Sequence, residues 1–172
     1  MRIYSGQARL IARELIELLV KEELIELLPD QRIEAQMDVE SILREYIRND
    51  REINEEARDT VRARGLGNGA MGRIKRRLAK ERGFGIGDEA REWLVQQTIE
   101  MLLYSNNIDE VYAEDRELRR AVNRVLNNYT NTDNEIDREA RSKLKNLEEG
   151  SAAWDIEYQR AMDAIKRNKG LT

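Results

Sequence analysis

Apolar residues recur along this chain every three or four positions, the spacing that places them on one face of an α-helix. Two stretches show the pattern at matching places, one near the start of the chain and one after its middle. Their apolar stripes are Ala8, Ile11, Leu15, Leu18 and Leu19, and Leu94, Thr98, Met101 and Leu102. Ser5 and Asp88 precede the two stretches and are the predicted N-caps of two amphipathic helices.

Each of these helices is followed by a short segment with strand character. Ser105-Asn106-Asn107 are poor helix formers that favour turns, so the second predicted helix ends there. Residues 108–112 then alternate apolar and polar, as a half-buried strand does. Because residues 25–29 occupy the corresponding place, we predict that the first helix ends near Glu22 or Glu23. We further predict that the two extended segments pair into a minor two-stranded ribbon.

The middle of the chain returns later in altered form, at an offset of 83 residues. Residues 42–62 and 125–145 share 8 identities in 21 aligned positions. The identical residues of the first copy are Leu43, Tyr46, Asp50, Glu52, Ile53, Glu56, Ala57 and Arg58. This repeat predicts that the chain consists of two related halves that arose by internal duplication.

Both copies contain a polar residue followed three residues later by glutamate. Asn49 is followed by Glu52, and Thr132 by Glu135, which is the spacing of a capping box at a helix start. Apolar stripes lie on both sides. Each half is therefore predicted to contain a helix, a capped turn and another helix, with the shared residues building structure and not a reactive site.

Both halves end in a similar way. A glycine-containing joint leads into a further helix, and a glycine directly after that helix ends it. The predicted last helices span residues 70–82 and 153–169. Gly83 followed by Phe84 ends the first, and Gly170 followed by Leu171 ends the second, as glycine and an apolar contact commonly end helices.

The fold class predicted from these patterns is all-α. We expect two helical repeats, residues 1–84 and 88–172, of about four helices each, sharing one core and packed as one unit through the short glycine-rich linker Gly83–Gly87. The composition agrees, because one proline and 40% hydrophobic residues with 37% charged residues favour a soluble helical protein. No apolar run approaches the roughly 20 residues of a membrane span. With no cysteine and no signal-peptide pattern, the expected location is cytoplasmic and no membrane contact is expected.

Charge is concentrated in one segment. Between Arg62 and Arg82 there are eight basic residues and one acid, Glu81. Four basic residues lie on one predicted helix face at i, i+3, i+4 and i+7, beside the flanking Arg82: Arg73, Arg76, Arg77 and Lys80. Such a face can contact phosphates or an acidic protein surface, or it can neutralise the acidic second half of the chain itself.

Catalytic and cofactor-binding signals are weak. Histidine and cysteine are absent, which removes the commonest general base and the usual zinc ligands. The loop Gly67–Gly72 matches GxGxxG, but it follows a predicted helix and not a strand, and we interpret it as a helix–helix joint. An acidic turn could attract a cation, although a solvated connection with Asp115 as helix cap explains it as well; its residues are Asp109, Glu110, Glu114, Asp115 and Glu117. We expect no catalytic residues, no cofactor and no metal.

Several stretches together resemble an uncharacterised bacterial family, domain of unknown function 507. They are residues 73–83 (Arg-Ile-Lys-Arg-Arg-Leu-Ala-Lys-Glu-Arg-Gly), 110–120, 135–141, and Glu149-Gly150-Ser151 with 154–158. The resemblance covers nearly the whole chain and rests on the order and spacing of these stretches. It implies a small bacterial cytoplasmic helical protein and supplies no functional residues.

The function expected from the sequence is that of a non-enzymatic helical interaction or adaptor protein that docks on an unidentified protein or ribonucleoprotein. The alternative is an RNA- or ribosome-binding protein that uses the basic helix 73–82. The candidate contact face is the same in both hypotheses: Arg73, Arg76, Arg77, Lys80 and Arg82.

Overall fold

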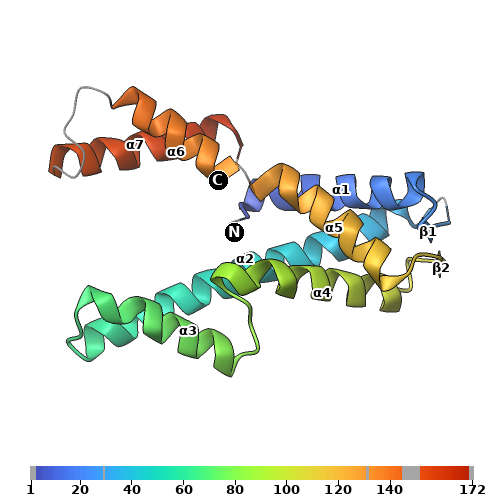
Figure 1. The fold of residues 1–172 in the computed structure, drawn as a ribbon, viewed down its shortest axis with the longest axis horizontal. Coiled ribbons are helices and arrows are strands. Elements are labelled where there is room, and N and C mark those ends of the chain that lie inside the picture. The colour runs from blue at the N-terminus through green and yellow to red at the C-terminus, as the bar shows by residue number, and fades with distance from the viewer. Residues whose placement is uncertain (1–2, 29, 131, 145–151, 171–172) are drawn as a thin grey trace.

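The computed structural model of the chain describes residues 3–28, 30–130, 132–144 and 152–170, and Figure 1 shows their arrangement. The helices are α1 (Ser5–Lys21), α2 (Arg32–Ala63), α3 (Met71–Glu81), α4 (Ala90–Tyr104), α5 (Asp115–Thr130), α6 (Thr132–Lys143) and α7 (Ala152–Asn168). Two short strands, β1 (Ile25–Glu26) and β2 (Glu110–Val111), form an antiparallel pair. The predicted mostly helical fold with a minor two-stranded ribbon is therefore confirmed.

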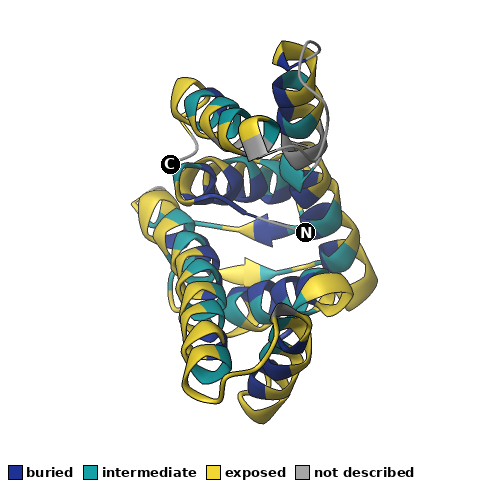
Figure 2. Ribbon diagram, turned by 90° about the vertical axis from the view of Figure 1, so that its left-hand side faces the viewer, coloured by how far each residue is buried: buried dark blue, intermediate teal, exposed yellow. Residues whose placement is uncertain are grey.

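Four helices form the body of the molecule. α1 packs against α2 and α5, and α4 packs against the same two helices from the other side. In Figure 2 the buried residues lie on the faces that these helices turn toward one another. The core includes the predicted stripes, with Ile11, Leu15 and Leu19 of α1 and Leu94 and Leu102 of α4 all almost completely buried. Within the described ranges, no helix combines the length and the apolar character that a membrane crossing requires.

The ribbon closes one end of this body. Ile25 pairs with Val111 and Glu26 with Glu110, and α1 ends at Lys21 as predicted. The first helix differs from the prediction at its start, because Tyr4 and not Ser5 is the N-cap. The Tyr4 N–H donates to the side-chain oxygen of Gln7 at 3.0 Å, and the Gln7 N–H donates to the Tyr4 carbonyl at 2.9 Å, so the glutamine at the third helical position satisfies the backbone N–H of the cap residue.

The predicted capped turn at Asn49 is wrong. α2 continues without interruption from Arg32 to Ala63, with Asn49 in its interior. The sequence around the expected turn, Ile47-Arg48-Asn49, contains only one residue that strongly favours leaving a helix. In addition, α3 packs along this part of α2, and Ile53 is completely buried there. Tertiary packing thus outweighs the capping signal.

The equivalent turn in the second half, predicted at Thr132, falls at a boundary of the described residues. The described part of α5 ends at Thr130 and that of α6 begins at Thr132, and residue 131 between them lies outside the described residues. The cap hydrogen bond predicted for the Thr132 side chain lies outside them as well.

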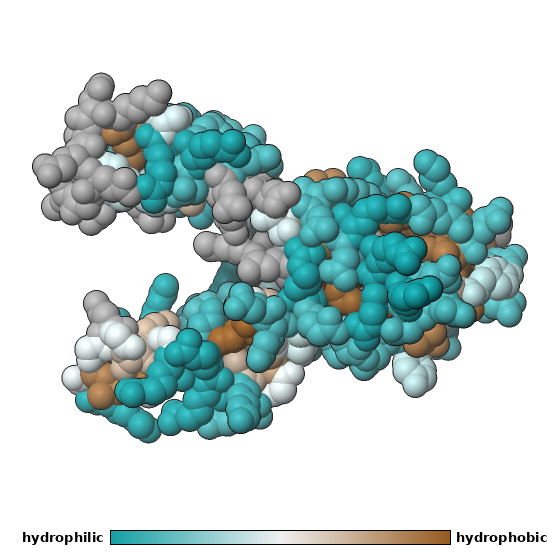
Figure 3. Space-filling view, in the orientation of Figure 1, coloured by the Kyte–Doolittle hydropathy of each residue, from teal (hydrophilic) through white to brown (hydrophobic). Residues whose placement is uncertain are grey.

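The molecule has a forked shape (Figure 1). The second half of α2 with α3 forms one arm, and α6 with α7 forms another (Figure 1). Open space separates the two arms in the space-filling view of Figure 3. The α6–α7 arm has its own small buried cluster, Tyr4, Ile136, Ala140 and Ile165, apart from the main core.

The stop after α3 follows the predicted geometry. Gly83 has φ of +61°, a left-handed conformation that glycine adopts without strain. Its N–H donates to the Lys80 carbonyl at 3.2 Å, and the Phe84 N–H donates to the Ala79 carbonyl at 2.8 Å, the hydrogen bonds of a Schellman motif. The chain then turns toward α4, which a short 3₁₀ turn, Gly87–Glu89, precedes.

Candidate functional site

The basic helix α3 lies on the second half of α2 through an apolar face. Ile74, Leu78 and Ala79 are buried, while the charged side chains between them are directed outward. The glycine-rich joint before α3 follows helix α2, and a 3₁₀ turn, Asn68–Ala70, leads into α3. Because the loop joins two helices, it lacks the strand-to-helix context of a dinucleotide-binding loop.

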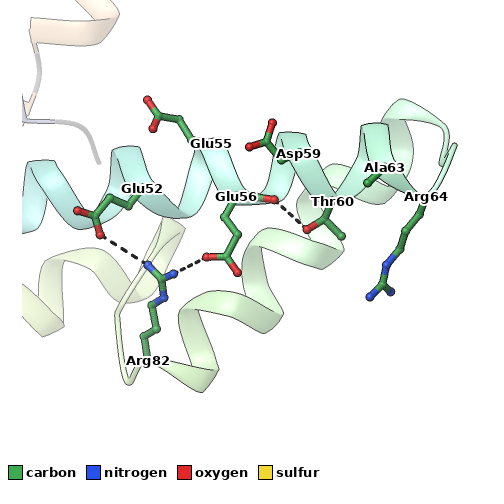
Figure 4. A pocket seen from close by; sticks show the side chains of 8 residues that line it. All are labelled: Glu52, Glu55, Glu56, Asp59, Thr60, Ala63, Arg64 and Arg82. Carbon is green, nitrogen blue, oxygen red and sulfur yellow. Dashed lines mark hydrogen bonds and ion pairs between the residues drawn. The ribbon is translucent and has the colours of Figure 1, made fainter.

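Two basic side chains hold α3 to α2. Lys75 Nζ lies 2.9 Å from the Asp50 carboxylate. Arg82 pairs with Glu56 and lies 3.8 Å from Glu52, as Figure 4 shows. The acids that neutralise this part of the basic helix therefore come from α2, in the first half of the chain, and not from the acidic second half. Arg82 of the predicted contact face thus serves the α2–α3 contact.

The other four members of the predicted face differ in whether they form an ion pair. Arg77 lies 3.5 Å from Glu81 in the next turn of α3, an exposed pair of small energetic weight. Arg73, Arg76 and Lys80 are exposed and make no ion pair with the residues that the structure describes. Exposed cations that form no ion pair within the described part of the chain are available to an external partner.

A groove of about 1070 Å³ separates α3 from the start of α4, and we call it the α3–α4 groove. Both helices pack against α2, and the groove lies between them. Arg76 and Lys80 border the groove from α3, whereas Arg73 and Arg77 are not among its lining residues. The structure thus divides the predicted continuous face into a groove side and a solvent side.

Aromatic side chains form the floor of the groove. The rings of Phe84 and Trp93 meet edge to face with centroids 4.9 Å apart, and Tyr46 of α2 lies 5.0 Å from Phe84 behind them. Trp93 Nε1 donates to the Gly83 carbonyl at 2.9 Å. A Cβ atom at Gly85 would lie 2.6 Å from both Glu89 O and Trp93 Cβ, so only glycine permits this close packing of the connection against α4.

The opposite wall of the groove is acidic. Asp88 and Glu89 precede α4, and Glu92 lies in its first turn, where negative charge is favourable at the positive end of the helix dipole. Glu92 is shared with Arg119 of α5, whose guanidinium lies 2.6 Å from it and 2.7 Å from Asp115. Hydrogen bonds to these two carboxylates raise the pKa of Arg119, which remains charged. The groove therefore has one basic and one acidic wall.

A second, shallower hollow of about 520 Å³ lies along α2 where Arg82 reaches it. Figure 4 shows Glu52 and Glu56 directed at Arg82, and Glu55 and Asp59 directed away from α3. Because Arg82 of α3's C-terminal end pairs there with Glu52 and Glu56 of α2, we assign the hollow to the α2–α3 contact.

The acidic turn before α5 has structural contacts of its own. The Glu114 N–H donates to Glu117 Oε2 at 3.0 Å, and Asp115 is the first residue of α5 and not its cap. The Tyr112 hydroxyl donates to Glu26, which joins the two strands. Across the parts of the chain that the structure describes, no three or more acidic side chains converge in a way that could hold a metal ion.

Trp93 is the residue that reasoning from the sequence missed. The sequence places no aromatic residue among the basic positions of α3, yet α4 brings Trp93 to the same groove as Arg76 and Lys80. No local pattern connects them, because they belong to different helices whose separation depends on how each packs against α2.

A known protein family matches nearly the whole chain. Residues 1–171 match the model of a family described as "Protein of unknown function (DUF507)", which confirms the resemblance noted in the sequence. A comparison with curated proteins gave no match.

Proposed function

The chain belongs to the DUF507 family, and we propose that it is a non-enzymatic interaction protein, an adaptor that binds another polypeptide through the α3–α4 groove. The observation that carries this proposal is the groove itself, with Arg76 and Lys80, which form no ion pair with any described residue, on one wall and Asp88 and Glu89 on the other. A polypeptide can offer charges of both signs to such walls and an apolar side chain to the Trp93 floor.

The titratable groups support a role without catalysis. Burial raises the pKa of Tyr46 to about 12, and burial with a hydrogen bond to Glu14 raises that of Tyr129 to about 12. A hydrogen bond to Glu26 raises the pKa of Tyr112 to about 12. Each shift has a packing or hydrogen-bond cause, and the three tyrosines lie in separate contacts. Perturbed groups at an active site typically converge on one cleft. The cytoplasmic location expected from the sequence stays a prediction.

The alternative function is RNA or ribosome binding through the exposed basic side of α3. Arg73, Arg76, Arg77 and Lys80 are all exposed and could contact successive phosphates. Asp88 and Glu89 on the facing wall would repel a nucleic acid that entered the groove. We therefore favour a protein partner and keep RNA as the competing outcome.

Affinity capture from the native host, followed by mass spectrometry, tests the proposal. The double variant Arg76→Glu with Lys80→Glu is expected to lose at least about 1.4 kcal/mol, or tenfold, of its affinity for the captured polypeptide. The matched control is Arg116→Glu with Arg120→Glu, two exposed basic residues four apart on α5, which should retain it. Equal capture by the groove variant and the wild type would contradict the proposal.

A salt titration with duplex and single-stranded RNA tests the alternative in parallel. We expect weak RNA binding that disappears as salt is raised toward physiological concentrations. Tight binding that is lost in Arg73→Glu with Arg77→Glu, whose side chains do not line the groove, would instead favour the RNA function.

We also propose that the two halves, residues 1–84 and 88–172, descend from one duplicated unit and share a core. Helix, strand and helix occur in the same order in both, as α1, β1 and α2 and as α4, β2 and α5. The contact of α1 with α5 corresponds to that of α4 with α2, as a two-fold relation between the halves requires. The main core draws on both halves.

Splitting the chain tests the shared core. Residues 1–84 and 88–172, expressed separately, are each expected to have little stable helix, because each half alone exposes the faces that α1 and α4 bury. Mixing the two fragments should restore helical circular dichroism. If each fragment alone unfolds cooperatively, the halves are independent domains and the shared core is refuted.

A further inference from the structure

The shape of the α3–α4 groove points to a particular kind of partner segment. Its α3 side presents Gly72, Arg76 and Lys80, and its other side presents Glu89, just before α4, and Gln97 of α4, with Trp93 on the floor between them. On each side these residues recur every four positions, as the residues of one helix face do. A groove bordered by two helices that both pack on α2 can receive a third helix packed against both.

The dimensions of the groove agree with a short helix. α3 has 11 residues, which corresponds to a wall about 16 Å long, or about three helical turns. Gly72 and Ala79 are small residues of that wall, and a Cβ atom at Gly72 would meet nothing within 4 Å. Small side chains allow a partner backbone to come close.

The charges of the two groove walls determine which charges the flanks of the bound helix must carry. With its apolar side over Trp93 and Phe84, a bound helix turns one flank toward Arg76 and Lys80 and the other toward Glu89. We infer that the groove binds an amphipathic partner helix whose apolar stripe lies between an acidic flank and a basic flank. This inference rests on the function proposed above and specifies the partner at that site.

The two walls also select the direction of the bound helix. Turning a helix end for end, with its apolar stripe kept against the floor, exchanges its flanks. Only one direction then places the acidic flank against Arg76 and Lys80 and the basic flank against Asp88 and Glu89. The opposite direction brings like charges together, which is unfavourable at an interface.

Three synthetic helical peptides of about 14 residues test the inference, with the same apolar stripe and different flanks. One has an acidic and a basic flank, one has two acidic flanks, and one has two basic flanks. Binding to the full chain is followed by the emission of Trp93 in a Trp154→Phe background, since these are the two tryptophans of the chain. We expect the mixed-flank peptide to bind about tenfold more tightly than either uniform peptide. Strongest binding by the doubly acidic peptide, or no binding by any of them, would overturn the inference.

Charge reversal at one wall supplies the second measurement. In Arg76→Glu with Lys80→Glu both walls are acidic, and the doubly basic peptide is then expected to become the tightest ligand. The control Arg116→Glu with Arg120→Glu, on α5, should keep the wild-type order of affinities. An unchanged order in the Arg76/Lys80 variant would refute the assignment of the walls.

The outcomes separate this inference from the function on which it rests. If no peptide binds but the Arg76/Lys80 variant still loses its native polypeptide partner in the capture experiment, the helix assignment fails and the groove function stands. If that variant also captures the partner normally, both fail. Sedimentation that shows self-association of the wild type, lost in the same variant, would assign the groove to a second copy of the chain and overturn the inference.

Discussion

Asn49→Pro is expected to lower the free energy of unfolding by about 3 kcal/mol or more, because proline in a helix interior removes a hydrogen bond and clashes with the preceding turn. Asn49 lies in the middle of α2. Ser5→Pro, by contrast, falls at the first residue of α1, directly after the extended residue Tyr4. Proline is tolerated at a first helical position that follows an extended residue, so we expect a change of less than about 1 kcal/mol there. Urea denaturation followed by far-ultraviolet circular dichroism measures both.

Asn49→Ala and Ser5→Ala are the controls, since they remove the same side chains without the effect of proline on the backbone. Subtracting them isolates the cost of the proline ring at each position. If Asn49→Pro is no more destabilising than Ser5→Pro, α2 is interrupted at Asn49 in solution. The continuous helix described here would then be refuted.

Ile53→Ala and Ile136→Ala are expected to give different kinds of unfolding, although the two residues are equivalent in the repeat and both are completely buried. Ile53 belongs to the main core, and its truncation should cost about 2–5 kcal/mol of global stability. Ile136 belongs to the small cluster of the α6–α7 arm. Its truncation should release that arm while the four-helix body remains folded, because few buried contacts hold the arm.

Hydrogen exchange with mass spectrometry distinguishes the two results. In Ile136→Ala, peptides from α6 and α7 should lose protection while those from α1, α2, α4 and α5 keep it. Ile53→Val and Ile136→Val, each expected to cost about 0.5–1.5 kcal/mol, are conservative controls. A loss of protection throughout the chain in Ile136→Ala would show that the arm and the body unfold as one unit.

The attachment of the α6–α7 arm explains why its stability should be separate. Tyr4, just before α1, is buried in the cluster of the arm, and Lys166 of α7 lies 5.5 Å from the centre of its ring. Gln7, on the next turn, is only 2% exposed and donates to the Tyr129 carbonyl at the end of α5. The arm is thus held at the start of α1 and the end of α5.

The candidate site could be predicted only in part. The 3.6-residue periodicity of α3 correctly separated its buried residues, Ile74 and Leu78, from its exposed basic ones. It could not show that Arg82 pairs with Glu52 and Glu56, since those acids lie more than twenty residues earlier. Nor could it show that Trp93 faces Arg76 across a groove. Both facts depend on the way α3 and α4 pack against α2.

By itself, the sequence determined the features that depend on neighbouring residues: the helix periods, the glycine stop at Gly83, the end of α4 at Ser105 and the strand character that pairs Ile25 with Val111. These follow from backbone preferences and from the apolar spacing of single segments. Tertiary structure alone decided that Asn49 lies inside a continuous helix, although Asn49 and Glu52 have the spacing of a capping box. The physical reason is that a capping signal is worth about 1 kcal/mol, less than the packing of a whole helix against its neighbour. The packing of α3 and α4 against α2 also placed the basic and the acidic residues on opposite walls of the groove.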